Sequence, residues 1–212
     1  MINILKKLLD LIYDKKCYFC SKTTDDSEFC DNCFSKVEYL SLSPVFTIDG
    51  VNVYSATLYE DIPQKLIRAV KFHNKKELAK YQAQIMVNFW QNLDISKKKY
   101  TVIPTPMFFS KARKRNYNHM DLVAEHFSKL MNYNFDKKAL IRNRETAPQY
   151  KLNRKQREDN LKDAFTLVKK IAEPVLILDD ISTTGTTLRE IISELKKFGI
   201  DDITCFVTAI PK

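Results

Sequence analysis

Two adjacent carboxylates, Asp179 and Asp180, follow a run of aliphatic residues that begins at Val175. A continuous apolar run of this length predicts a strand that is buried on both faces of a parallel sheet. A hydroxyl-rich turn comes next, made of Ser182, Thr183, Thr184, Gly185, Thr186 and Thr187. Gly185 permits a tight turn, and the N–H groups at the start of the following helix can bind an anion. Carboxylates accept hydrogen bonds from sugar hydroxyls while amides and hydroxyls donate to phosphate, so the stretch predicts a pocket for a ribose 5-phosphate.

The alternative is an ordinary buried strand followed by a helix with Ser and Thr residues at its cap. Two acids at one strand end argue against it, because burying a carboxylate is unfavourable without a partner. The stretch VLILDDISTTGTT is similar to the signature of type I phosphoribosyltransferases, which bind phosphoribosyl pyrophosphate (PRPP). The resemblance implies that Asp179 and Asp180 hold the ribose hydroxyls and that Thr183 to Thr187 bind the 5-phosphate. If the protein is catalytic, it implies that Asp179 and Asp180 are the catalytic residues. It also implies Mg²⁺ bound together with PRPP.

A second loop is expected at the same edge of the sheet. A buried strand ending near Ile103 runs into Pro104, Thr105 and Pro106, and the prolines stiffen the backbone just past the strand. In phosphoribosyltransferases the matching first loop holds pyrophosphate. The resemblance therefore implies contacts from Thr105, Arg113 and Arg115, since arginine can bind phosphate in bidentate fashion. A merely solvated basic loop is the alternative.

The helix expected after this loop carries two histidines, His119 and His126, which are seven residues apart. Residues at this spacing share one face of a helix. No third ligand is evident, so we expect neither a metal site nor a catalytic role for them.

Four cysteines near the start of the chain form two C-x-x-C pairs, Cys17 with Cys20 and Cys30 with Cys33. Two such knuckles let four thiolates meet around a tetrahedral Zn²⁺ ion, and a site with four protein ligands is structural. Disulfides are the competing interpretation, but no signal peptide is recognisable and thiols stay reduced in the cytosol. Cys205, in an expected terminal strand, is interpreted as a small buried apolar residue.

An arginine-rich stretch, RNRETAPQYKLNRKQREDNLKDAF, follows the strand expected at 139–142. It contains almost no apolar residues, which predicts a mobile flap. Its RxRxTxPQ pattern resembles the ComF family, as do the R-K-R-N-Y-N cluster after the Pro-Thr-Pro loop and the four-cysteine module. The loop opening P-T-P-M-F-F is more apolar than in the family, which leaves the pyrophosphate contacts of this chain less defined.

ComF-like proteins are implied to act in natural transformation, where they handle single-stranded DNA in the cytosol. We therefore expect a competence protein that binds PRPP and single-stranded DNA, with other DNA-uptake or recombination proteins as partners. Basic and aromatic side chains suit a strand of bases, and the candidates are Lys114, Tyr117, Arg144, Tyr150, Lys151, Arg154 and Arg157. A metabolic phosphoribosyltransferase acting on a nucleobase and a PRPP-sensing regulator without turnover remain as alternatives.

The composition and the order of expected elements bound these hypotheses. Lysines and arginines number 35 against 26 acids, giving a formal charge of +9 that favours polyanions or simply solubility. No apolar run approaches the 18 or so residues of a membrane span, so we expect a cytoplasmic protein. From residue 100 onward strands alternate with helices, which predicts an α/β fold with a mostly parallel sheet flanked by helices. We expect a helix and zinc module over residues 1–40 and a phosphoribosyltransferase-like domain over residues 45–212.

Overall fold

The strand predicted from Val175 lies inside a six-stranded sheet with the order β3-β4-β10-β9-β5-β6. Every neighbouring pair is parallel except β3 and β4, which form an antiparallel hairpin across Asp49 and Gly50. This order places β9 between β10 and β5, so both of its edges are hydrogen-bonded. A fully buried central strand needs apolar side chains on both faces, which explains the continuous run from Val175 to Leu178.

The computed structural model describes residues 15–24, 27–110, 113, 117–144 and 161–212. The strands are β1 (Lys15–Lys16), β2 (Thr23–Thr24), β3 (Phe46–Ile48), β4 (Val51–Leu58), β5 (Thr101–Pro104), β6 (Asn134–Phe135), β7 (Leu140–Arg142), β8 (Phe165–Leu167), β9 (Val175–Ile181) and β10 (Ile203–Ile210). The helices are α2 (Asp31–Phe34), α3 (Asp61–Phe72), α4 (Ala79–Trp90), α6 (His119–Met131) and α8 (Thr186–Lys197), with 3-10 turns η1 (Lys76–Leu78) and η2 (Asp94–Lys97). The expected N-terminal helix over 1–14 and most of the expected flap lie outside the described residues.

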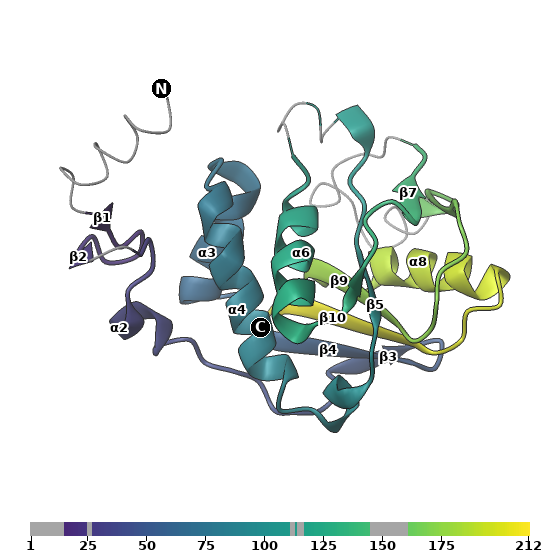
Figure 1. The fold of residues 1–212 in the computed structure, drawn as a ribbon, viewed down its shortest axis with the longest axis horizontal. Coiled ribbons are helices and arrows are strands. Elements are labelled where there is room, and N and C mark those ends of the chain that lie inside the picture. Colours follow the sequence, from purple (N-terminus) through teal and green to yellow (C-terminus); the bar gives the residue numbers. More distant parts are fainter. Residues whose placement is uncertain (1–14, 25–26, 111–112, 114–116, 145–160) are drawn as a thin grey trace.

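The sheet separates two hydrophobic cores (Figure 1). One core lies against α3, α4 and α6 and is built around the fully buried Trp90, whose ring packs on Phe206 at a centroid distance of 4.9 Å. The other core lies against α8 and the small antiparallel sheet of β7 and β8. The expected α/β class, with a mostly parallel sheet flanked by helices, is confirmed.

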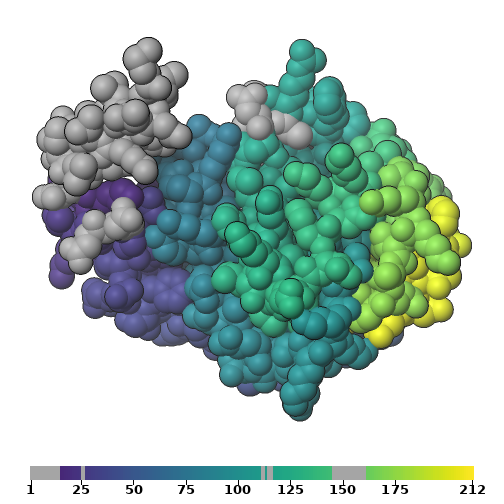
Figure 2. All heavy atoms as spheres, in the orientation of Figure 1, coloured from purple at the N-terminus to yellow at the C-terminus, as the bar shows by residue number. Residues whose placement is uncertain are grey.

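The cysteine module consists of β1, β2 and α2 and lies beside α3 and α4 (Figure 2, purple against blue). Its Phe29 is 2% exposed and contributes to the same core as α4, where its ring contacts that of Tyr81. The module therefore packs on the main sheet domain through shared apolar surface. The division into residues 1–40 and 45–212 stays a prediction.

Among the described residues, no helix combines the length and the apolar character that a bilayer crossing requires.

Candidate functional site

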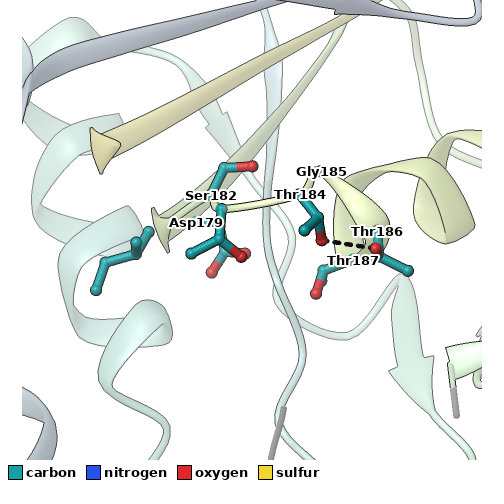
Figure 3. Close-up of a pocket in the computed structure, with 8 residues that line it drawn as sticks. Asp179, Ser182, Thr184, Gly185, Thr186 and Thr187 are labelled. Carbon is teal, nitrogen blue, oxygen red and sulfur yellow. Dashed lines mark hydrogen bonds between the residues drawn. The ribbon is translucent and has the colours of Figure 1, made fainter. Parts of the chain in front are cut away.

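A small cavity lies at the carboxyl end of β9, where the strand passes into α8 (Figure 3). It is lined by Asp179, Ile181, Ser182, Thr183, Thr184, Gly185, Thr186 and Thr187. Ligands of parallel α/β sheets bind at this edge, because the loops that leave the strands gather there. The structure thus brings the first acid and the whole hydroxyl-rich turn into one cavity.

Gly185 shapes the wall of this cavity. Its φ of 71° is in the left-handed region, and it stands at the N-cap of α8. A Cβ atom at this position would lie 2.9 Å from Ile48 Cδ1 on β3, so another residue would be strained at this φ and would require the Ile48 side chain to shift. Its carbonyl oxygen accepts the N–H of Arg189 at 2.8 Å, which closes the first turn of α8. The N–H groups of that turn consequently begin directly at the cavity, where they favour a bound anion.

Hydroxyl groups line the turn, and some of them are buried. The hydroxyls of Thr184 and Thr186 lie 2.8 Å apart and share one hydrogen bond. Ser182 is 4% exposed, and its Oγ has no hydrogen-bond partner among the described residues. Thr105 Oγ1, past the end of β5, is also buried and without a partner in the described part of the chain. Buried polar atoms usually have partners, so these two hydroxyls are suited to hydrogen-bond a polar ligand.

The two acids point to opposite sides of the sheet. Val175 and Ile177 belong to the core on the α8 face, whereas Leu176 and Leu178 belong to the core on the α3, α4 and α6 face. Side chains alternate along a strand, so Asp179 continues the first series and Asp180 the second. The cavity lining agrees, because it includes Asp179 and not Asp180. The two carboxylates therefore lie on opposite faces of the sheet, and the role of both acids in holding ribose hydroxyls stays a prediction.

Asp180 is held by one residue from α3 and one from α6. Lys71, in the last turn of α3, forms an ion pair through Nζ with Asp180 Oδ2. His119 Nε2, in the first turn of α6, lies 2.7 Å from the same oxygen. Asp180 Oδ1 accepts the N–H of Ile181 at 2.8 Å. Helical periodicity indicates which face of a helix is buried, but it cannot show that two helices end on one carboxylate, so no sequence signal identified this cluster.

The electrostatic environments of the two acids differ accordingly. Burial and the neighbouring carboxylate of Asp180 raise the pKa of Asp179 to about 7. Burial also acts to raise the pKa of Asp180, but Lys71 and His119 outweigh it and hold that pKa well below its ordinary value. Burial lowers the pKa of the Arg142 guanidinium on β7, and the charge of Asp179 opposes this shift. The Arg142 guanidinium and the Asp179 carboxylate therefore attract each other electrostatically.

The Pro-Thr-Pro segment is attached to the same edge. Thr105 N–H donates to the carbonyl of Leu178 at 2.8 Å, which extends the pairing of β5 with β9. Asn118 caps α6 by accepting the N–H of Met120 at 3.2 Å. Arg113 is exposed, while Lys114 and Arg115 lie outside the described residues. The expected contacts of Thr105, Arg113 and Arg115 with pyrophosphate stay a prediction.

The residues expected to contact DNA are only partly described. Tyr117 is half-buried, donates its hydroxyl hydrogen to the carbonyl of Val70 at 2.5 Å, and has Lys76 Nζ 4.6 Å from its ring centre. Arg144 is exposed and donates to the carbonyl of Lys162 at 2.6 Å. The remaining candidates of the flap lie outside the described residues, and they are Tyr150, Lys151, Arg154 and Arg157.

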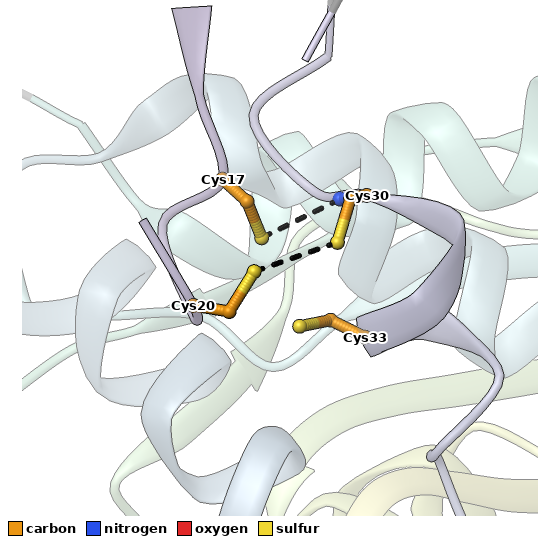
Figure 4. A group of neighbouring side chains, drawn as sticks. All are labelled: Cys17, Cys20, Cys30 and Cys33. Carbon is orange, nitrogen blue, oxygen red and sulfur yellow. Dashed lines mark hydrogen bonds between the residues drawn. The ribbon is translucent and has the colours of Figure 1, made fainter. Parts of the chain in front are cut away.

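The four N-terminal cysteines converge (Figure 4). The sulfur atoms of Cys17, Cys20, Cys30 and Cys33 all lie within 4.8 Å of one another, and none is in a disulfide. Four sulfurs around a zinc ion, each about 2.3 Å from the metal, stand about 3.8 Å apart in a tetrahedron. The Sγ atoms of Cys20 and Cys30 are 3.7 Å apart, which matches that spacing. The cluster can hold a metal ion such as zinc, and the disulfide interpretation is wrong.

Cys205 lies in β10 and is fully buried, as predicted. Burial and the nearby charge of Asp179 raise the pKa of its thiol. The thiol is therefore a core group and is separate from the four-cysteine cluster.

Polar contacts fasten the cysteine module to the main domain. Tyr18 Oη and His73 Nδ1 lie 3.0 Å apart, and His73 is the C-cap residue that follows α3. Glu28 forms an ion pair with Lys80 at 3.1 Å and accepts the hydroxyl hydrogen of Tyr81 at the same distance. These contacts fix the module against the end of α3, near Lys71, and against the start of α4.

Two curated proteins are similar to this chain in sequence. The chain is 28% identical over 200 residues to competence protein F of Haemophilus influenzae, which covers 88% of this chain and 86% of that protein. It is 29% identical over 143 residues to the DNA utilization protein YhgH of Shigella flexneri, covering 63% of this chain and 61% of YhgH. The alignment thus spans under two thirds of the length of YhgH. No protein-family model matches the chain.

Two solved structures also align with the chain, each at 19% identity. The glutamine PRPP amidotransferase from B. subtilis aligns with a TM-score of 0.39, covering 80% of this chain and 29% of that one. The UMP synthase of Leishmania donovani aligns with a TM-score of 0.34, covering 68% of this chain and 23% of that one. At the sequence level the chain is a homologue of competence protein F and YhgH, and the resemblance to the ComF family is confirmed.

Proposed function

We propose that the protein handles incoming DNA in the cytoplasm during natural transformation, and that it binds PRPP at the end of β9 and single-stranded DNA through its basic segments. Homology to competence protein F and to the DNA utilization protein YhgH supports the DNA role. The formal charge of +9 is compatible with a polyanionic partner. Proteins of DNA uptake or recombination are the further partners that this role implies.

The cavity at the end of β9 carries the PRPP part of the proposal. The start of α8 offers N–H groups and threonine hydroxyls for a 5-phosphate, and Asp179 offers a carboxylate for a ribose hydroxyl. Ser182 and Thr105 each present a buried hydroxyl with no partner among the described residues. Since Mg²⁺ prefers a carboxylate together with substrate phosphates, Asp179 is the residue that suits a magnesium ion bound with PRPP.

Transfer of the phosphoribosyl group to an acceptor would displace pyrophosphate at the anomeric carbon. The bond from that carbon to the pyrophosphate oxygen breaks, the bond to the acceptor forms, and pyrophosphate carries away the electron pair. Such a reaction depends on positioning and on charge stabilisation. Arg113 and Arg115 are our candidates for the charge that stabilises the leaving pyrophosphate.

DNA binding is tested by its dependence on salt. Binding of a labelled single-stranded oligonucleotide should weaken steeply between 50 and 200 mM salt, because cationic side chains displace counterions. The variant Arg154→Ala/Arg157→Ala should bind more weakly and with a shallower salt dependence. Its charge-matched control is Lys97→Ala/Lys129→Ala, which removes exposed lysines from η2 and α6. Binding that is absent or independent of salt would contradict the DNA part of the proposal.

Titration with PRPP and Mg²⁺, in the presence and absence of the oligonucleotide, separates the remaining functions. If the two sites are coupled, each ligand changes the affinity for the other by the same factor. Release of pyrophosphate with a defined nucleobase acceptor would instead indicate a metabolic phosphoribosyltransferase. PRPP binding that alters the affinity for a protein partner, without turnover or DNA binding, would indicate a regulator.

A further inference from the structure

We propose that Lys71 and His119 are positioning residues of the cavity, which clamp Asp180 from the opposite face of the sheet and leave Asp179 as the acid that contacts the ligand. This inference rests on the proposed PRPP site and assigns different roles to two acids that are neighbours in sequence. It also adds two residues to the site from helices that do not line the cavity.

The protein already uses the hydrogen-bonding capacity of Asp180. Its Oδ2 receives both Lys71 Nζ and His119 Nε2, and its Oδ1 receives the N–H of Ile181. Asp179 is engaged less, since its Oδ1 accepts the N–H of Asp180 at 2.9 Å and its Oδ2 has no donor among the described residues. Asp179 therefore keeps an acceptor for a ligand hydroxyl or a metal ion, and it is the acid that lines the cavity.

The clamp joins three elements that are distant in sequence. Lys71 lies in the last turn of α3, His119 begins α6, and Asp180 is the penultimate residue of β9. The side chains of His119 and Asp180 are 7% and 6% exposed, and that of Lys71 is 25% exposed. In such a buried cluster, removal of one partner leaves an uncompensated charge, which is strongly destabilising. The folded protein therefore favours the arrangement in which all three side chains stay in contact.

The position of the clamp connects it to ligand binding. Asp180 is followed directly by Ile181 and Ser182, which begin the cavity wall. Fixing Asp180 against α3 and α6 therefore fixes the backbone from which Ser182, the threonines and Asp179 face the ligand. Loss of the clamp should consequently weaken ligand binding although neither clamp residue lines the cavity.

The experiment is isothermal titration of the full chain with PRPP and Mg²⁺. His119→Ala and Lys71→Met should each reduce the affinity at least tenfold, while His119→Gln and Lys71→Arg, which keep a donor, should recover part of the loss. The matched controls are His126→Ala, an exposed histidine on α6, and Lys97→Met, an exposed lysine on η2. Both should bind PRPP as the wild type does. The unfolding midpoint of each variant in urea establishes that it is folded.

A double-mutant cycle tests whether the histidine acts through Asp180. The losses from His119→Ala and Asp180→Asn should overlap and fail to add in the double variant, because both remove the same contact. Asp179→Asn should weaken binding more than Asp180→Asn does. The inference would be overturned if folded His119→Ala and Lys71→Met bound PRPP with wild-type affinity, or if the losses in the double variant were fully additive. It would also be overturned if Asp180→Asn weakened binding more than Asp179→Asn. Failure of the wild type to bind PRPP would instead reject the proposed function on which the inference rests.

Discussion

His119 Nε2 lies 2.7 Å from Asp180 Oδ2, although 61 residues separate the two in the chain. The contact attaches the first turn of α6 to the end of β9, next to the cavity at the start of α8. Together with the ion pair from Lys71 it compensates a buried carboxylate that would otherwise be unfavourable in the core. The cavity is therefore supported from the face of the sheet that it does not occupy.

The first prediction concerns Gly185. Gly185→Ala should destabilise the protein by about 1–3 kcal/mol and should weaken PRPP binding, because alanine is strained at positive φ and its Cβ would meet Ile48 Cδ1 at 2.9 Å. The measurement is the urea midpoint of unfolding and the PRPP affinity of the same preparation.

Gly199→Ala provides the matched control for this substitution. Gly199 also has a positive φ, of 73°, but a Cβ there would meet nothing within 4 Å. It should cost only about 1 kcal/mol, from backbone strain, and should leave PRPP binding unchanged. Equal effects of the two substitutions would show that the close approach of Ile48 does not matter.

The second prediction concerns the four-cysteine cluster. The purified protein should contain one zinc ion per chain, and Cys17→Ser should lose it and unfold at a lower urea concentration, because metal binding contributes directly to folding. Cys205→Ala, which removes the buried cysteine of β10, should keep the full zinc content. A zinc-free wild type of undiminished stability would contradict a structural metal site.

The third prediction concerns pH. The pKa of Asp179 is raised from 3.8 to about 7, so the folded protein holds a proton on this group where the unfolded chain has lost it. The folded state then binds more protons between about pH 4 and pH 7, and this acid lowers stability as pH rises through that window. Asp179→Asn should therefore stabilise the protein at pH 7.5 relative to the wild type and should give little gain at pH 4.

The size and control of this effect follow from the same linkage. One pKa unit corresponds to about 1.4 kcal/mol, so the gain at pH 7.5 should be at most a few kcal/mol. Asp180→Asn should act in the opposite direction, because Lys71 and His119 hold the pKa of Asp180 low and its charge stabilises the fold above about pH 4. Urea midpoints measured from pH 4 to pH 8 give both curves. A pH-independent difference for Asp179→Asn would refute the assignment.

Local patterns in the sequence predicted much of this molecule. The strand from Val175, the turn at Gly185 and the helix after it follow from an apolar run, a glycine and a helical period, and each depends on neighbouring residues only. The four cysteines were identifiable because their spacing alone determines that they can meet.

The clamp on Asp180 could not be found in this way. Lys71 and His119 are ordinary residues of two helices, and they reach the site only because α3 and α6 lie on the same face of the sheet as Asp180. Strand alternation does separate Asp179 from Asp180, and this signal was present in the sequence. What it could not supply was the identity of the groups on each face, since those depend on how helices pack across more than 60 residues of chain.

The central claim is that the cavity at the end of β9 binds the ribose 5-phosphate part of PRPP. Isothermal titration of the wild-type chain with PRPP and Mg²⁺ tests it most directly, with ribose 5-phosphate as a competitor. We predict binding of one PRPP per chain that ribose 5-phosphate displaces and that Asp179→Asn abolishes. No binding of PRPP by the folded, wild-type protein, or binding that Asp179→Asn leaves unchanged, would contradict the account.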